Sequence, residues 1–355
     1  MRATAARLRV GSWVLVPLGI GIASRVYSSA LLHFFAGHQH HHHVDPFVAW
    51  DAQWYLRIAA LGYHAVPVQP SATGGHYDFA FFPAWPMTIR AVTAVVPPRD
   101  IVAVVLANLL FILAAVLLWR VLRDRFEARV ATGAVALLAF SPPAYVLSMA
   151  YSEPLFLVVI GLYFLARGRA IRQSALAALA MVTRIAGAAI LASALVGLIR
   201  DRGADRRRWL LILGAGTAAF AAWWIFIALL VHDPLGFLRG APSWAPTTGA
   251  GQIVNDVRDL TVERVAWLGF VGTVLLGGLL IIRRDVELGV FALANVAFVL
   301  LPGAFVSSAP RYMLVAFPAF AGLSQRLGRR GTIALLIVFA LGQWLFVRYS
   351  SYAAP

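Results

Sequence analysis

The chain has 355 residues, of which 61% are hydrophobic and 13% are charged, and its mean hydropathy is +0.79. Soluble globular domains carry about 45–50% apolar and about 25% charged residues, so this composition excludes an ordinary soluble enzyme and a disordered chain. The net charge of +15 comes from arginine alone, because the sequence has no lysine. It has no cysteine either, which excludes disulfides, thiol catalysis and cysteine-based zinc sites.

The first apolar run predicts a membrane helix. Arg2, Arg7 and Arg9 precede the run 11–35, which is too long for the core of a signal peptide. We therefore expect a first transmembrane helix with a cytoplasmic N-terminus. Further apolar runs follow at 101–119, 130–147, 153–166, 174–199, 209–231, 265–282, 288–306, 312–324 and 331–347. They predict one all-α polytopic membrane domain over residues 1–355, without a separate soluble domain.

The arginine clusters orient these helices, because positive charge gathers in cytoplasmic loops. The clusters expected in the cytoplasm lie at 120–129, 167–172, 200–208, 283–284 and 326–330. Two long segments, 36–100 and 232–264, are then extracytoplasmic loops. Within the first loop, residues 81–97 are flanked by Pro83 and Pro86 and are expected to form an interfacial helix.

The run 174–199 has arginine clusters on both sides, so a single crossing would place one cluster outside. A re-entrant hairpin that turns at residues 183–187 keeps both ends in the cytoplasm. One long tilted helix is the alternative. With the hairpin, the sequence predicts about nine crossings, about 11 membrane helices and an extracytoplasmic C-terminus.

The polar residues of the chain gather in the loops of one face. Asp51 and Tyr55 would share one face of a helix, next to an apolar stripe of Trp50, Trp54 and Ile58. A second aromatic stretch, 78–86, carries Asp78. Channels and transporters place polar groups near the middle of the membrane instead, so this distribution favours chemistry on a lipid-linked substrate. An aromatic belt with incidental aspartates is the alternative.

Three arginines are candidate ligands for a phosphate. Arg25 and Arg184 lie inside apolar runs, where an ionisable side chain is costly and is a functional candidate by default. Arg311 follows Pro310 at the outer end of a predicted helix. The guanidinium fork suits phosphate oxygens, although a structural ion pair remains the alternative for each residue.

Residues 38–43, five histidines and Gln39, form a run that is typical of metal-binding tracts, but a run without secondary structure gives no defined coordination geometry. We therefore expect a solvated loop and no metal site. The sequence contains no nucleotide-binding or hydrolase motif.

Taken in order, these motifs resemble the PIG-V-like mannosyltransferases of the GT-C superfamily. The resemblance covers nearly the whole chain, and it rests on Trp50-Asp51, Tyr55, Ile58-Ala59 and Gly62-Tyr63, on Ala80-Phe81-Phe82-Pro83 and Pro86, on Tyr151-Ser152-Glu153, on Thr183-Arg184 and Gly187, and on Pro310-Arg311-Tyr312 with Pro318. It implies a GT-C-like helix bundle, and transfer of mannose from a polyprenyl-phosphate-mannose donor on the extracytoplasmic face of the membrane. It also implies an acidic catalytic residue in the first outside loop, which corresponds to Asp51. Some relatives carry a further acid, for which only Asp78 is near.

Residue chemistry agrees with this resemblance. A glycosyl phosphate already carries a good leaving group, so one base and cations for the leaving phosphate suffice. Asp51 is the expected base, and Arg184 and Arg311, with Arg25, are expected to bind the phosphate. Direct displacement inverts the anomeric centre. Residues expected to contact the substrates are Trp50, Trp54, Tyr55, Tyr151, Glu153 and Tyr312. A donor with one phosphate has little need of a divalent metal, so no obligate metal cofactor is expected.

Several alternatives stay open. The acceptor can be a cell-envelope glycolipid, a lipoglycan or a protein, and another sugar such as arabinose or glucose is possible. A transporter or flippase that binds a lipid phosphate would use the same arginines, and a non-catalytic subunit of a cell-envelope complex is the third class. Nucleic acid is not an expected partner. The amino-acid bias indicates a bacterial plasma membrane.

Overall fold

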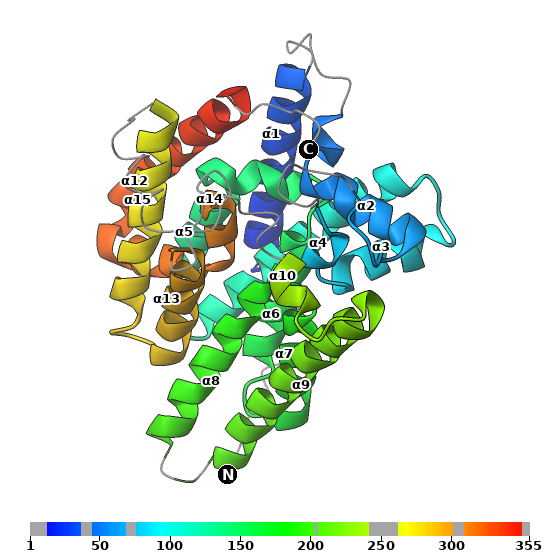
Figure 1. Cartoon of the computed structure of the whole chain (residues 1–355). Coiled ribbons are helices and arrows are strands. Elements are labelled where there is room, and N and C mark those ends of the chain that lie inside the picture. The colour runs from blue at the N-terminus through cyan, green and yellow to red at the C-terminus, as the bar shows by residue number, and fades with distance from the viewer. Residues whose placement is uncertain are drawn as a thin grey trace.

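The computed structural model describes residues 13–36, 45–68, 76–201, 203, 205–240, 262–300 and 309–349. These residues form an all-helical bundle (Figure 1). Its α-helices are α1 (Leu15–Ala36), α2 (Asp51–Leu61), α3 (Ala84–Thr93), α4 (Arg99–Arg123), α5 (Ala128–Ala139), α6 (Glu153–Leu165), α7 (Ala170–Met181), α8 (Ala188–Arg200), α9 (Arg206–Val231), α10 (Gly236–Gly240), α12 (Val262–Ile281), α13 (Val286–Leu300), α14 (Ala309–Tyr312) and α15 (Pro318–Tyr349). The 3-10 helices are η1 (Pro46–Val48), η2 (Asp78–Ala80), η3 (Pro142–Ser148), η4 (Ile185–Gly187) and η6 (Met313–Val315).

Four of the described helices are long and apolar enough to cross a membrane: α1, α4, α9 and α15. The bent pair α5 and η3 raises this number to five if it forms one span. Four shorter apolar stretches of 10–17 residues lie in α6, in η4 with α8, in α12 and in α13: Glu153–Leu165, Ile185–Arg200, Val265–Ile281 and Val286–Phe298. The chain is therefore a multi-pass membrane protein, and the count of nine crossings stays a prediction.

The apolar run 130–147 does not form one straight helix. The chain bends by 77° between α5 and η3, where Pro142 and Pro143 follow Ser141. Proline lacks a backbone N–H and clashes with the preceding turn, so a proline pair ends an α-helix. Arg25 holds this bend from α1, because its guanidinium donates to the carbonyl oxygens of Ala139 and Ala144, at 3.2 and 3.1 Å.

Helices α7 and α8 meet at a break that falls within the segment expected to turn. Arg184 has extended backbone (φ −159°, ψ 151°), and η4 follows it directly. Two contacts locate the far ends of both helices beside the first turn of α9. The Arg208 Nε donates to Gln173 Oε1 of α7 at 2.6 Å, and Gly197 of α8 lies against the Trp209 ring. Helices α7 and α8 therefore run in opposite directions, as the arms of a hairpin.

The last helix, α15, bends at a glycine. Gly328 has φ 67° and ψ −171°, a conformation that is strained for other residues. The sequence predicts two apolar runs separated by the arginines 326–330, and the bend lies within that arginine segment.

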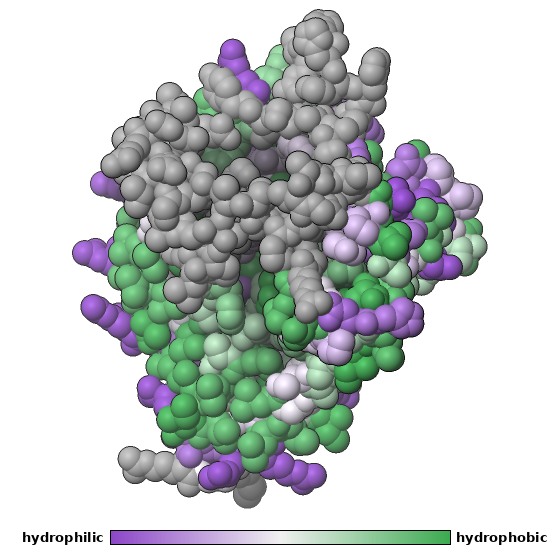
Figure 2. Space-filling model, viewed as in Figure 1, coloured by the Kyte–Doolittle hydropathy of each residue, from purple (hydrophilic) through white to green (hydrophobic). Residues whose placement is uncertain are grey.

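Most arginines of the described chain gather at the end of the bundle where α6 turns into α7 and α8 leads to α9. We call this the arginine-rich end. Figure 2 shows a broad apolar surface, with hydrophilic residues gathered at its lower edge around the start of α9. A network of charged side chains, which we call the basal network, joins helices here: Arg125, Arg167, Arg208, Asp285 and Glu287.

The opposite end of the bundle carries the short elements of the segment 45–100. Figure 1 places α2 and α3 together on one flank, away from α12, α13 and α15. Trp85 of α3 is fully buried and donates its Nε1–H to the carbonyl of Ala150 at 2.9 Å. The Ala150 N–H donates in turn to the Phe47 carbonyl at 3.0 Å. These bonds fix the start of α2 against the start of α6.

Candidate active site

Asp51 begins α2 and is held there by an unusual backbone. Trp50, the preceding residue, has φ 53° and ψ −121°. A non-glycine residue in this region costs about 1–3 kcal/mol, and such strain is characteristic of functional sites. The conformation places the Asp51 carboxylate at the positive end of α2, which stabilises a negative charge. The side chain is 24% exposed, so it can be reached from outside the bundle.

Glu153 occupies the corresponding position at the start of α6. Its side chain is completely buried, and it is the acidic residue of the first turn. A buried carboxylate requires ionic partners, because burial without them costs several kcal/mol. Two guanidinium groups supply the partners, those of Arg184 at 2.9 Å and Arg311 at 3.6 Å.

Arg184 lies at the tip of the α7–α8 hairpin. Its Nη1 contacts Glu153 Oε2 at 2.9 Å and donates to the Ser152 hydroxyl at 2.6 Å. The guanidinium carbon lies 5.3 Å from the centre of the Tyr312 ring, where a cation is attracted by the ring face. The hairpin turn therefore delivers a buried cation to the start of α6.

Arg311 of α14 joins the two carboxylates. Its Nη2 lies 2.7 Å from Asp51 Oδ2 and also donates to the Tyr312 hydroxyl at 2.9 Å. The guanidinium lies over the rings of Tyr151 and Tyr312, at 4.9 and 4.7 Å. Asp51, Arg311, Glu153 and Arg184 thus form a chain of alternating charges from four distant segments. We call these four residues the charge cluster.

Two buried tyrosines, Tyr55 and Tyr151, line the charge cluster as neutral hydroxyls. The Tyr55 hydroxyl forms a 2.9 Å hydrogen bond with Ser152 Oγ. Burial, with the negative charges of Asp51 and Glu153, raises the pKa of Tyr55 far above its ordinary value, although Arg184 opposes the shift. Burial and the charge of Asp51 likewise raise the pKa of Tyr151. These phenols stay protonated at physiological pH, so they can form hydrogen bonds but cannot act as bases.

Opposite effects act on Arg311. Burial lowers its pKa, but the negative charges of Asp51 and Glu153 outweigh burial and raise the pKa well above its ordinary value. The residue therefore keeps its positive charge. Its Nε lies 3.6 Å from Glu153 Oε1, an ion-pair contact without hydrogen-bond geometry.

Aromatic rings form the side of the site next to α2. The Trp54 ring stacks on the Phe81 ring with centroids 5.7 Å apart and an angle of 6° between the planes. The Tyr55 ring meets the edge of Phe81 at 5.1 Å. Trp54 is 3% exposed, so its ring packs in the core, whereas Trp50 is only partly buried.

Arg25, expected at the phosphate site, contacts a different part of the molecule. Besides the two carbonyls at the bend of α5 and η3, its Nη1 donates to the Ser148 hydroxyl at 2.9 Å. Its guanidinium also lies 4.3 Å from the centre of the Phe111 ring. These contacts give Arg25 a structural role, and none of them reaches the charge cluster.

Asp78, expected as a second catalytic acid, pairs with a histidine. Its fully buried carboxylate accepts the backbone N–H of His64 at 3.2 Å and contacts His64 Nδ1 at 2.7 Å. Nearby, the Tyr63 hydroxyl donates to the Phe81 carbonyl at 2.8 Å. The pair connects the end of α2 to η2, so Asp78 supports the aromatic side of the site without contacting Asp51.

The position of Ser152 in the site was not predicted from the sequence. Its hydroxyl joins Arg184 to Tyr55, and its only signal was its place between Tyr151 and Glu153 in a motif already singled out. The histidine run 38–43 and most of the loop 232–264 lie outside the described residues. Within the described residues, no group of three or more histidine and acidic side chains could hold a metal ion.

The fold is similar to that of a known membrane glycosyltransferase. Crystal structures of an oligosaccharyltransferase from Archaeoglobus fulgidus match the chain with TM-scores of 0.51–0.52 and 14–16% sequence identity. One was solved in the apo form, one with zinc and sulfate, and one tethered to an acceptor peptide. The matches cover 94–96% of this chain and 53–56% of the oligosaccharyltransferase, so the chain spans little more than half of that protein. The chain therefore has a GT-C-like fold.

A family model matches the first part of the chain. The family model described as Mannosyltransferase (PIG-V) matches residues 27–200, which include Asp51, Glu153 and Arg184. No curated protein sequence is similar enough to count as a match. This match agrees with the resemblance drawn from the motifs: residues 27–200 are similar to the PIG-V mannosyltransferases, and the described residues have a GT-C-like fold.

Proposed function

We propose that the chain is an inverting mannosyltransferase that uses a polyprenyl-phosphate-mannose donor at the charge cluster. The observation that carries this proposal is the 2.7 Å contact between Asp51 and Arg311, next to the pair of Glu153 and Arg184. Transfer requires one carboxylate and at least one cation beside the same reacting carbon, and this contact provides both.

The donor phosphate and Asp51 compete for the same guanidinium. In the described structure the Arg311 Nη2 is shared between Asp51 and the Tyr312 hydroxyl. A bound phosphate, itself anionic, would draw Arg311 and Arg184 toward its oxygens and weaken the contact with Asp51. The carboxylate, freed from its ion pair, becomes a better proton acceptor. Donor binding thus activates the base only when a sugar is in place.

In the transfer step, Asp51 removes the proton of an acceptor hydroxyl, whose oxygen attacks C1 of the mannose. The bond from C1 to the phosphate oxygen breaks, and the electron pair leaves with the phosphate. Arg184 and Arg311 stabilise the negative charge that develops there. Attack from the face opposite the phosphate inverts C1, so a β-linked donor gives an α-mannoside. Glu153 contacts both arginines and holds them in position.

We further propose that the site faces the extracytoplasmic side and the arginine-rich end faces the cytoplasm, because basic residues favour cytoplasmic positions. In this orientation the α7–α8 hairpin enters from the cytoplasm and turns at the site. Backbone at such a turn must be buried in protein or line a cavity. The Arg184 side chain is 8% exposed, which supports the buried location. The acceptor is a glycolipid, lipoglycan or protein of the cell envelope.

The proposal is tested by transfer of labelled mannose from polyprenyl-phosphate-mannose to a membrane glycolipid extract. Purified protein in nanodiscs is compared with Asp51→Asn and with the control Asp100→Asn, an exposed aspartate in the first turn of α4. Removing a general base lowers the rate by about 100-fold or more, so we expect that loss for Asp51→Asn alone. Near-normal transfer by this variant would remove Asp51 from the mechanism.

The same assay separates the other classes of protein. Movement of the intact donor across liposome membranes, without transfer of label, would identify a flippase. If neither transfer nor movement occurs and a second protein copurifies with the chain, a non-catalytic subunit is indicated. For a transferase or a flippase, donor binding should depend on Arg184. The affinity of the variant Arg184→Gln for the donor measures this dependence directly.

A further inference from the structure

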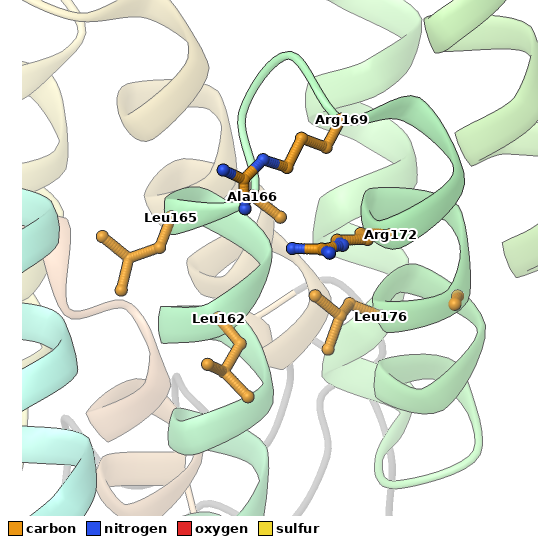
Figure 3. A pocket seen from close by; sticks show the side chains of 7 residues that line it. Leu162, Leu165, Ala166, Arg169, Arg172 and Leu176 are labelled. Atoms are coloured by element: carbon orange, nitrogen blue, oxygen red, sulfur yellow. The ribbon is translucent and has the colours of Figure 1, made fainter.

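A groove lies between α6 and α7 at the arginine-rich end. It has a volume of about 370 Å³ and is lined by Leu162, Leu165, Ala166, Arg169, Arg172, Ala175 and Leu176. The lining residues of α6 are spaced by three and four, and so are those of α7, so each helix contributes one face. Figure 3 shows the Arg169 and Arg172 guanidinium groups directed into the space between the helices, above leucine side chains.

The groove and the charge cluster occupy opposite ends of the same helix. Glu153 is the first residue of α6 and Leu165 is the last, a separation of about 18 Å at 1.5 Å per residue. The groove therefore lies near the opposite membrane interface. A donor bound at Arg184 and Arg311 cannot place its phosphate there.

The two arginines of the groove have no acidic partner among the described residues. Their neighbour Arg167 pairs with Glu287 at 3.6 Å, but neither Arg169 nor Arg172 forms an ion pair in the described chain. Both are exposed. They lie three residues apart, a spacing at which like charges on a helix repel each other. An anion between them would remove that repulsion.

The end of α7 adds to the positive potential. Arg169 is the N-cap of α7 and makes no capping hydrogen bond, and the first turn contains no acidic residue. The first backbone N–H groups of a helix are unpaired, and its N-terminus is the positive end of the helix dipole. Arginine is unfavourable at this end unless an anion is present. Gly168, with φ 81°, makes the tight turn that brings both arginines back over α6.

The apolar part of the groove opens toward the lipid. Leu162 is 40% exposed although it belongs to an apolar helix, in whose last turn it lies, and Leu165 and Leu176 are partly exposed beside it. A small soluble anion would leave these leucines without a partner. An acyl chain would cover them, and a basic pocket between membrane helices suits an anionic headgroup.

We propose that this groove binds an anionic phospholipid of the leaflet at the arginine-rich end. The phosphate lies between Arg169 and Arg172 at the start of α7, and an acyl chain lies along Leu162, Leu165 and Leu176. The site does not depend on the proposed transfer reaction. A bound lipid connects α6 to α7, the two helices whose far ends carry Glu153 and Arg184.

Native mass spectrometry of the full chain with phosphatidylglycerol, and with phosphatidylcholine for comparison, tests this proposal. Each arginine near a membrane surface contributes about 1 kcal/mol to binding an anionic lipid, so Arg169→Gln with Arg172→Gln should lower retention of phosphatidylglycerol by about tenfold or more. The control is Arg329→Gln with Arg330→Gln, two exposed arginines of α15. This pair removes the same charge elsewhere and should retain the lipid.

Two further experiments distinguish a bound lipid from a bound soluble anion. Ala175→Phe places a ring at the exposed rim of the groove without changing charge, and it should also weaken phosphatidylglycerol binding. Inorganic phosphate, added as a competitor, should displace little lipid. The proposal is overturned if both double variants lose the lipid equally, if neither loses it, or if phosphatidylcholine binds as well. Complete displacement by inorganic phosphate would also overturn it, in favour of a soluble anion.

Discussion

The molecule has two clusters of charged side chains, at opposite ends of α6 and α7, and they differ in which member is accessible: the cation Arg167 (56% exposed) in the basal network and the carboxylate Asp51 in the charge cluster. The basal network links the α4–α5 and α6–α7 connections to the first turn of α9 and the start of α13. Its Glu287 contacts Arg125, Arg167 and Arg208 at 3.5–3.9 Å. The charge cluster has the same alternation of charges, but its Asp51 is 24% exposed and follows a strained backbone. The first arrangement is typical of a structural support, and the second combines charge with access.

Matched glutamates test this difference most strongly. Each of Glu153 and Glu287 is a buried carboxylate between arginines, at 0% and 9% exposure. Glu153→Gln should lower transfer per folded molecule by about 100-fold, because Arg184 and Arg311 lose the group that positions them for the developing charge. Glu287→Gln should leave that rate nearly unchanged and lower stability by about 3 kcal/mol, since it leaves buried arginines without their shared partner.

Transfer rates and thermal unfolding in detergent measure both variants. Asp51 and Ser152 still contact Arg311 and Arg184 in Glu153→Gln, so its unfolding temperature should fall less than that of Glu287→Gln. If Glu287→Gln loses its activity while still folded, the two clusters are coupled and the distinction between support and site fails.

A smaller effect is expected from the hairpin turn. An added methyl group at Gly187 would lie 2.7 Å from the backbone of Ala180 and Met181. Gly187→Ala should therefore force the turn apart, cost about 1–3 kcal/mol and lower transfer, because Arg184 shifts with the turn. Gly214→Ala in α9 is the control, since its methyl group meets nothing within 4 Å. Equal activity of the two variants would show that the turn does not position Arg184.

The smallest effect is expected from metal removal. In the proposed site two guanidinium groups bind the donor phosphate, so transfer in excess chelator should stay within about twofold of the untreated rate. Restoration of lost activity by added divalent ions would contradict this expectation. The test applies equally to residues 38–43, the histidine run.

Much of the site could be predicted from residue type and order. Arg184 was selected because ionisable groups inside apolar runs are costly, Arg311 for its place after Pro310, and Asp51 and Glu153 for the motifs in which they stand. The structure places all four together. Their pairing was not predictable, since it depends on how α14 and the hairpin pack. Arg25 illustrates this limit: the same rule selected it, but the proline bend of α5 and η3 presents carbonyl groups that bind it. Asp78 similarly finds His64, which the sequence does not indicate.

The fold shows a similar division. Hydropathy and arginine clusters predict an all-helical membrane protein and the position of the turn near Arg184. They overlook the 77° bend within 130–147, although Pro142 and Pro143 were present as a signal. Hydropathy does not predict the helix lengths either, because α6 and α8 are too short by themselves to span about 30 Å of hydrocarbon.

The charge cluster contains two carboxylates and two guanidinium groups, so its formal charge is zero before substrate arrives. In the proposed reaction Asp51 takes up a proton, and the sum becomes positive while the lipid phosphate product is still bound. The product is then held electrostatically until the proton leaves for the outside water. Return of the carboxylate restores its pair with Arg311 and expels the phosphate. In the proposed reaction the empty enzyme would therefore return to its resting pair of Asp51 and Arg311 without a separate conformational switch.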